Sequence, residues 1–253
     1  MAGLRIVRDA GVLRLTFDRP ERLNSLTAEL IHEAADAVDA AAGDGTRVIV
    51  LTGTGRAFSS GADVGPDGSP PGMDTLQAAN RLVTSLTGVP VPVVAAVNGI
   101  AAGVGCSFAL AADIAIAAES AGFMLAFTRI GLMPDGGATH LVPAAVGRAR
   151  AMRMALLAEK VSAATAVEWG LVADVVPDDD FAAYIEGLVE QLAAGPPLAY
   201  AATKAAVNAA SLDHLQQALS REAVGQEPLL GSADFAEGMA AFQEKRAATF
   251  TGS

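Results

Sequence analysis

The chain has 253 residues, of which 52% are hydrophobic and 18% charged, and 28 Asp+Glu against 17 Lys+Arg give a formal net charge of -11. The apolar content excludes an intrinsically disordered chain. The acidic balance argues against a nucleic-acid-binding protein. A lone cysteine excludes a disulfide scaffold and a cysteine-based zinc site.

The longest apolar stretch, residues 91–105, falls short of the ~20 residues that a membrane-spanning helix needs, and Pro92 and Asn98 interrupt it. We interpret it as a buried strand followed by a glycine loop. The N-terminal residues lack the long apolar core of a signal peptide. We therefore expect a cytoplasmic protein without a membrane partner, with part of its apolar surface buried in an oligomer.

Strands and helices alternate in the first half of the chain. Apolar alternation predicts a β-hairpin over 4–8 and 12–17. Thr27 is typical of a helix N-cap, and the helix after it ends by Gly43. The further elements expected up to residue 117 are strands at 48–52, 93–97 and 113–117, separated by a loop at 53–72, a helix at 74–87 and a short helix from Val104.

The second half of the chain is predominantly helical. Periodicity predicts one strand, at 171–175, and helices over 148–158, 162–169, 178–193, 197–209, 212–224 and 232–247. We therefore expect an α/β core over residues 1–190 and a C-terminal helical region over 191–253.

Two glycine-rich turns follow predicted strands, at 57–63 and 98–105. In a parallel sheet both lie at the carboxyl edge, where ligands usually bind. Two such turns can direct backbone N–H groups at one point, which is how an oxyanion hole is built. Glycine is also expected where tight turns pack closely, and spacing alone favours that simpler interpretation.

Asp135 lies in a Pro-Asp-Gly sequence, which is a strong turn signature and needs no chemistry. Its neighbours in the sequence are apolar, so its carboxyl group is expected to be partly desolvated. Desolvation raises the pKa of a carboxyl group and makes it a better general base. Taken alone, the turn interpretation is favoured.

Other catalytic motifs are absent from the sequence or incomplete. The glycines after residue 52 lack the third glycine of a dinucleotide fingerprint, and no phosphate-binding P-loop is present. Cys106 and Ser107 have no base nearby in the sequence. The histidines are isolated, so we expect no metal site.

Seven segments of the chain form a recognisable set of motifs: residues 17–24, 56–63, 92–103, 112–119, 130–137, 168–172 and 241–246. Taken together, they resemble the enoyl-CoA hydratase/isomerase (crotonase) superfamily over essentially the whole chain. The resemblance implies a spiral of ββα units, with C-terminal helices that form trimers, often paired as hexamers. It also implies that the backbone N–H groups of Ala62 and Val104 stabilise a thioester enolate.

At two positions the sequence departs from the pattern of the superfamily's hydratases, and both positions bear on the reaction. Hydratases of this superfamily use two glutamates, and the corresponding positions here hold Ser107 and Phe127. Residues 127–152 are instead most similar to the isomerase branch, which includes 1,2-epoxyphenylacetyl-CoA isomerases and 3-enoyl-CoA isomerases. That similarity implies Asp135 as the base. A hydratase or hydrolase in which Asp135 activates water, and a non-catalytic CoA-thioester-binding subunit, remain alternatives.

The resemblance implies an acyl-CoA substrate and no separate cofactor. Arg19, Arg22, Arg56, Lys245 and Arg246 are candidates for contacts to the CoA phosphates. The loop Val64–Gly72 is expected to cover the acyl pocket. The residues expected to bind substrate are Arg22, Leu23, Ser60, Asp63, Val64, Gly105, Ser107, Phe127, Leu132, Pro134, Phe242 and Lys245.

Overall fold

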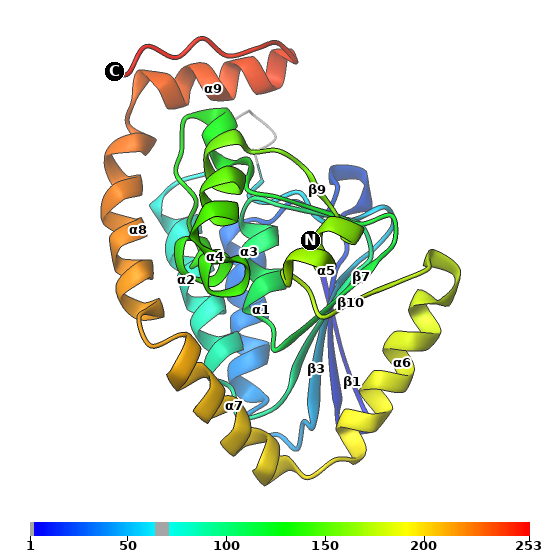
Figure 1. Cartoon of the computed structure of the whole chain (residues 1–253). Coiled ribbons are helices and arrows are strands. Elements are labelled where there is room, and N and C mark those ends of the chain that lie inside the picture. The colour runs from blue at the N-terminus through cyan, green and yellow to red at the C-terminus, as the bar shows by residue number, and fades with distance from the viewer. Residues whose placement is uncertain (1–2, 64–70) are drawn as a thin grey trace.

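The computed structural model describes residues 3–63 and 71–253. The larger of two sheets has the strand order β1-β2-β3-β5-β7-β10 (Figure 1). The predicted hairpin is confirmed as an antiparallel pair, and the other neighbours are parallel. The strands are β1 (Leu4–Asp9), β2 (Val12–Phe17), β3 (Val48–Gly53), β5 (Val93–Val97), β7 (Ile114–Ala118) and β10 (Asp174–Val176).

A smaller sheet, in the order β4-β6-β8-β9, was not predicted. Its strands have only two or three residues, too few to show a pattern. They are β4 (Ala57–Ser59), β6 (Ile100–Ala102), β8 (Gly122–Met124) and β9 (Val161–Ser162). Three of them directly follow β3, β5 and β7, so the predicted glycine-rich turns contain short strands.

The two sheets and their helices form the expected spiral of ββα units. β3 and β4 lead to α2 (Met73–Gly88), and β5 and β6 lead to α3 (Val104–Ala111). β7 and β8 lead, through the 3₁₀ turn η2 (Ala126–Ile130), to α4 (Ala138–Leu157). Each unit thus adds one strand to each sheet, and the mixed α/β class is confirmed.

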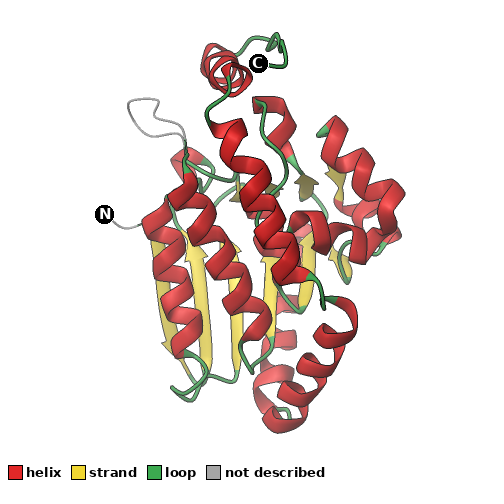
Figure 2. Cartoon of the chain, turned by 90° about the vertical axis from the view of Figure 1, so that its left-hand side faces the viewer, coloured by secondary structure: helices red, strands yellow, loops and turns green. Residues whose placement is uncertain are grey.

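Helices cover both faces of the larger sheet. On one face lie α2, α3 and α1 (Ala28–Ala40), whose N-cap Thr27 accepts a hydrogen bond from the Leu30 N–H (Figure 2). On the other face α6 (Asp178–Ala194) packs Ile185 and Val189 against residues of β3, β5 and β7. The expected boundary after residue 190 falls inside α6.

α4 begins ten residues before the predicted helix at 148–158. Its two segments meet at Gly147, whose φ of 77° and ψ of 162° are not helical. Pro143 and Gly147 hid the first segment from the sequence pattern, because both residues ordinarily end helices. The predicted strand at 171–175 is also displaced, since β10 begins only at Asp174.

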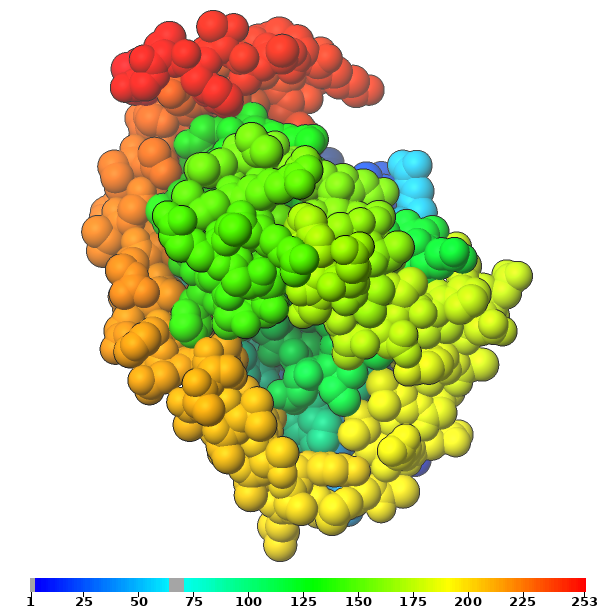
Figure 3. Space-filling model, viewed as in Figure 1, coloured from blue at the N-terminus to red at the C-terminus, as the bar shows by residue number. Residues whose placement is uncertain are grey.

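The remaining helices are α5 (Ala163–Trp169), α7 (Pro197–Ser211), α8 (Leu215–Leu230) and α9 (Ala233–Glu244). α7 and α8 run along one side of the molecule, and α9 with the C-terminal tail lies across its top (Figures 1 and 3). Within the residues described, no helix is long and apolar enough to cross a membrane.

Lys204 anchors α7 to the core. Its ammonium group lies 2.7 Å from the Leu86 carbonyl oxygen and 2.9 Å from Asp113 Oδ2. Burial lowers the pKa of Lys204 and raises that of Asp113, while their attraction opposes both changes. No residue of α7 is fully buried, and the surface between α7, α6 and α4 is hollowed (Figure 3).

Candidate active site

Two glycines bring the turns after β4 and β6 into contact. Gly61 has φ +97°, and a Cβ atom there would lie 3.0 Å from the Ala102 carbonyl oxygen and 3.5 Å from Gly103 Cα. Gly103 has φ +53°. A side chain at either position would strain the backbone, and one at Gly61 would also push the turns apart. The two expected donor residues, Ala62 and Val104, directly follow these glycines.

The N–H groups of Ala62 and Val104 are both available to a ligand. A bridge to Leu26 uses the Gly61 carbonyl and the Asp63 N–H, at 2.9 and 2.8 Å, which leaves the Ala62 N–H on the other side. Val104 is the first residue of α3, so its N–H has no partner within the helix. Among residues 3–63 and 71–253, no acceptor binds either group. Both residues line one cavity.

Asp63 fixes the turn that carries Ala62. Its carboxylate accepts hydrogen bonds from Ser25 Oγ at 2.9 Å and from Arg22 Nη1 at 3.0 Å, and it lies 2.8 Å from Arg19 Nη1. Burial favours a raised pKa for Asp63, but the bonds from Arg19 and Ser25 outweigh it and lower the pKa. Arg19, a candidate phosphate contact, is therefore used in this clamp and does not line the cavity described here.

Asp135 lines the same cavity as these turns and is almost out of solvent, at 8% exposure. Burial raises the pKa of its carboxyl group to about 7, and the nearby charge of Glu222 acts in the same direction. A hydrogen bond from Gln226 Nε2 to Asp135 Oδ2, at 2.7 Å, opposes the rise. A carboxyl group with this pKa can both accept and return a proton near neutral pH.

Glu222 and Gln226 were not identified from the sequence. They lie one turn apart on α8 and are 0% and 1% exposed. Glu222 accepts hydrogen bonds from the N–H groups of Gly137 and Thr139 at 2.7 and 2.8 Å, and so caps α4. Their only signal in the sequence is that they continue the apolar stripe of Leu215, Ala218 and Leu219 with polar side chains.

The cavity has a volume of about 910 Å³. α9 closes one side of it, because Gly238 packs closely on Ile130 of η2 and brings Met239 and Phe242 to the wall. Val64 lies outside the described residues. The expected site residues that line the cavity are Arg22, Leu23, Ser60, Ala62, Asp63, Val104, Phe127, Leu132, Asp135, Phe242 and Lys245.

Three expected substrate contacts, Gly105, Ser107 and Pro134, lie behind this wall instead of lining it. Gly105 allows α3 to approach β4, since a Cβ atom there would lie 2.7 Å from Ser59 Cβ. Ser107 is fully buried, and its hydroxyl group donates to the Asp135 backbone carbonyl at 2.8 Å. It supports the turn that presents Asp135.

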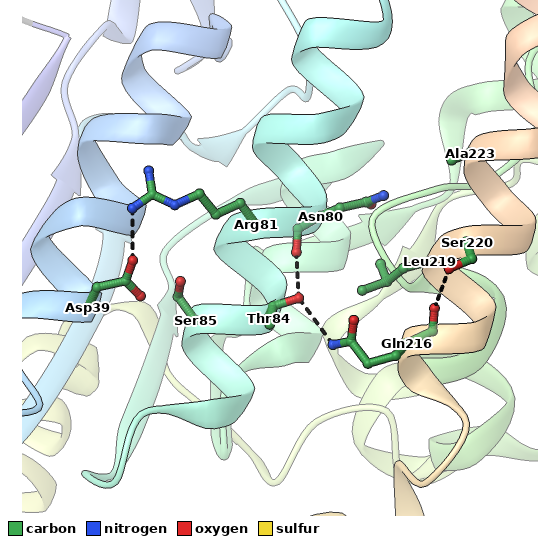
Figure 4. Close-up of a pocket in the computed structure, with 9 residues that line it drawn as sticks. All are labelled: Asp39, Asn80, Arg81, Thr84, Ser85, Gln216, Leu219, Ser220 and Ala223. Carbon is green, nitrogen blue, oxygen red and sulfur yellow. Dashed lines mark hydrogen bonds and ion pairs between the residues drawn. The ribbon is translucent and has the colours of Figure 1, made fainter.

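The other candidate sites in the described residues lack groups suited to catalysis. A second cavity, of about 550 Å³, lies between α1, α2 and α8, where Arg81 pairs with Asp39 (Figure 4). Burial raises the pKa of the Cys106 thiol to about 12, so it is not a nucleophile. No cluster of metal-ligating side chains occurs in residues 3–63 and 71–253.

The enoyl-CoA hydratase/isomerase family profile matches residues 7–253. A protein named probable enoyl-CoA hydratase from Rhodobacter capsulatus is 49% identical over 247 residues, covering 96% of this chain and 95% of that protein. The 1,2-epoxyphenylacetyl-CoA isomerase of Escherichia coli is 43% identical over 252 residues, covering 96% of each.

Among solved structures, an enoyl-CoA hydratase from Mycobacterium avium subsp. paratuberculosis superposes with a TM-score of 0.93 and 51% identity, covering 99% of both chains. The whole fold, including both glycine turns and the C-terminal helices, is therefore shared with that structure. Because the profile and these relatives extend over nearly its full length, the chain belongs to the enoyl-CoA hydratase/isomerase family.

Proposed function

We propose that this chain is an acyl-CoA isomerase, which moves the double bond of a 3-enoyl-CoA or a ring-derived CoA thioester. The observation that carries the proposal is a buried carboxyl group, Asp135, with its pKa raised to about 7 in a cavity that also contains two available N–H donors. One base and one oxyanion hole are what a 1,3-proton shift beside a thioester requires.

In the proposed reaction the thioester carbonyl oxygen accepts hydrogen bonds from the Ala62 and Val104 N–H groups. Asp135 removes a proton from C2, and the electron pair of that C–H bond forms a dienolate whose charge rests on the carbonyl oxygen. The protonated Asp135 returns the proton to C4, and the remaining double bond lies between C2 and C3. Asp135 ends as the carboxylate, so no other reactant is consumed.

Addition of water is the alternative reaction. The relative from Rhodobacter capsulatus carries the name of a probable hydratase. In the hydratase pattern two glutamates handle the water, and here those positions hold Ser107, which is engaged with the Asp135 carbonyl, and Phe127. The absence of a carboxyl group at either position favours isomerisation.

The test is an assay of the wild-type protein on 3-hexenoyl-CoA, following the absorbance of the conjugated 2-enoyl product, beside hydration of a 2-enoyl-CoA. We expect isomerisation to be much the faster reaction. Faster hydration would replace the proposal with a hydratase. Binding of both thioesters without turnover would identify a non-catalytic subunit.

The pH dependence of the isomerisation follows from the state of Asp135. The base form is required, so kcat/KM should rise with pH through an apparent pKa of about 7 and level off above it. Below that value we expect a fall of about tenfold per pH unit, measured with 3-hexenoyl-CoA. If kcat/KM instead rose through a single apparent pKa near 4, the ordinary range of an aspartate, the assignment of Asp135 as the base would be contradicted.

We propose that Arg22, Arg56 and Lys245, which line the cavity, contact the CoA phosphates. Replacing Arg56 or Lys245 by Ala should raise KM by roughly threefold to tenfold and leave kcat unchanged, because exposed charges contribute modestly to binding. The effect should shrink in high salt. Arg148→Ala, an exposed arginine outside the cavity, is the control. An equal change in that control would contradict the assignment.

We also propose that the C-terminal helices form a homotrimer or a dimer of trimers. α7 has no fully buried residue, and Leu198 and Val207 on it are 85% and 57% exposed. Apolar surface of this kind is typical of subunit interfaces. Sedimentation should give the mass of three or six chains, and Leu198→Asp with Val207→Asp should lower it. A monomeric wild-type protein would refute the proposal.

A further inference from the structure

Gln226 contacts the Asp135 turn at three atoms. Its Nε2 group donates to the Met133 carbonyl oxygen at 2.9 Å and to Asp135 Oδ2 at 2.7 Å, and its Oε1 accepts from the Met133 N–H at 3.1 Å. Every polar atom of this side chain is used. An amide held at both ends cannot rotate, so the position of Asp135 Oδ2 is fixed as well.

The two oxygens of Asp135 are therefore unequal. Oδ2 is bound by Gln226, whereas no donor among the described residues reaches Oδ1. Asp135 also lines the cavity, so its remaining exposure is toward the space that a substrate would enter. The arrangement separates an oxygen that is held from an oxygen that is free to react.

Several contacts fix α8, which carries Gln226. Glu222, one turn earlier, binds the N–H groups of Gly137 and Thr139 and holds the other end of the Asp135 turn. Near the start of the helix, Gln216 Nε2 lies 3.2 Å from Thr84 Oγ1 of α2 (Figure 4). Gly225 lets the helix approach closely, since a Cβ atom there would lie 2.5 Å from Met133 Sδ.

We propose that Gln226 is a positioning residue for the isomerisation: it holds Asp135 Oδ2 so that Oδ1 alone takes the proton from C2 and returns it to C4. A single oxygen then serves both carbons on one face of the substrate. This inference rests on the proposed isomerase function. It adds Gln226, a residue of the C-terminal helical region, to the residues that position the base.

Gln226 should also influence the titration of Asp135. Its hydrogen bond stabilises the ionised form, against burial and the charge of Glu222. Without that bond the carboxyl group should hold its proton to a higher pH. The other charged groups facing the cavity are Glu21, Arg22, Arg56, Asp63, Arg129 and Lys245.

The test compares Gln226→Met, Gln226→Glu and the control Gln217→Met, an exposed glutamine on the same helix. In Gln226→Met the acid limb of kcat/KM should move upward by about one pH unit, as expected for loss of a hydrogen bond to a charged group. Gln226→Glu keeps an acceptor for the Met133 N–H but adds a negative charge beside Asp135. The acid limb of kcat/KM should therefore move upward by more than in Gln226→Met. Gln217→Met should match the wild type.

The titration of Asp135 is measured in parallel by carbon NMR of the labelled carboxyl group in the unliganded protein. An upward shift of this titration in a protein without isomerase activity would show that Gln226 acts on Asp135 while the proposed function fails, so the two failures can be told apart. Folded Gln226 variants that lose activity equally at every pH, with an unmoved Asp135 titration, would overturn it and leave Gln226 a structural residue.

Discussion

Replacing Asp135 by Asn should lower isomerase kcat by about 10³–10⁴-fold while the thioester still binds. The amide cannot take a proton from C2, but it has nearly the same shape and can still accept the hydrogen bond from Gln226. Stopped-flow binding and steady-state turnover on 3-hexenoyl-CoA measure the two quantities. Asp179→Asn, an exposed aspartate on α6, is the control and should keep full activity. Unchanged turnover in Asp135→Asn would refute the proposed base.

The same substitution should make the protein more stable in alkaline solution. The folded pKa of about 7 lies above the ordinary value of 3.8, so the native state binds the proton more tightly than the unfolded chain does. Stability therefore falls as pH rises from near 4 to near 7, by up to about 4 kcal/mol in total. The Asp135→Asn variant has no proton to lose at this position, so urea unfolding at pH 8 and pH 4 should show a gain only at pH 8.

Replacing Gly61 by Ala should reduce kcat by about 10²-fold with little change in KM. The new Cβ atom would meet the Ala102 carbonyl oxygen at 3.0 Å, so the two turns must separate by a fraction of an ångström. Donors of an oxyanion hole act mainly on the transition state and tolerate little displacement. The kcat–KM comparison on 3-hexenoyl-CoA measures the effect.

Gly45→Ala is the matched control for that variant. Gly45 also has a positive φ, +87°, but a Cβ atom there meets nothing within 4 Å. Both variants should lose roughly 1–2 kcal/mol of stability through backbone strain, and only Gly61→Ala should lose turnover. Equal activity in the two variants would show that contact between the turns does not matter for catalysis.

The fold could be predicted where local patterns were long enough to be informative. The hairpin, the buried strands β3 and β5 and the capped helix α1 all follow from residues within a few positions of one another. Strands β4, β6, β8 and β9 have two or three residues each, so their pairing is decided by the chain around them. The first segment of α4 was missed because packing there overrides Pro143 and Gly147.

The residues of the site, like the elements of the fold, could be predicted only where the signal was local in the sequence. Asp135 and the two glycine turns carry local signatures, and the family resemblance gave those signatures a chemical meaning. Gln226 offers only a polar side chain on an apolar helix stripe, because its partner Asp135 lies 91 positions away and only the folded chain brings the two together. Ser107 shows a different case: its motif position predicts a contact to substrate, and the folded chain adds that its hydroxyl group donates to the Asp135 backbone carbonyl.

The long separation between Asp135 and α8 has a consequence for synthesis. A ribosome releases the chain from its N-terminus, so both glycine turns emerge well before residue 215, where α8 begins. A nascent chain that stops short of α8 contains the Ala62 and Val104 N–H groups, but it lacks the side chains that cap α4 and hold the Asp135 carboxyl group. The support of Asp135 is thus completed only after both glycine turns have emerged, and α9, which closes one side of the cavity, follows later still.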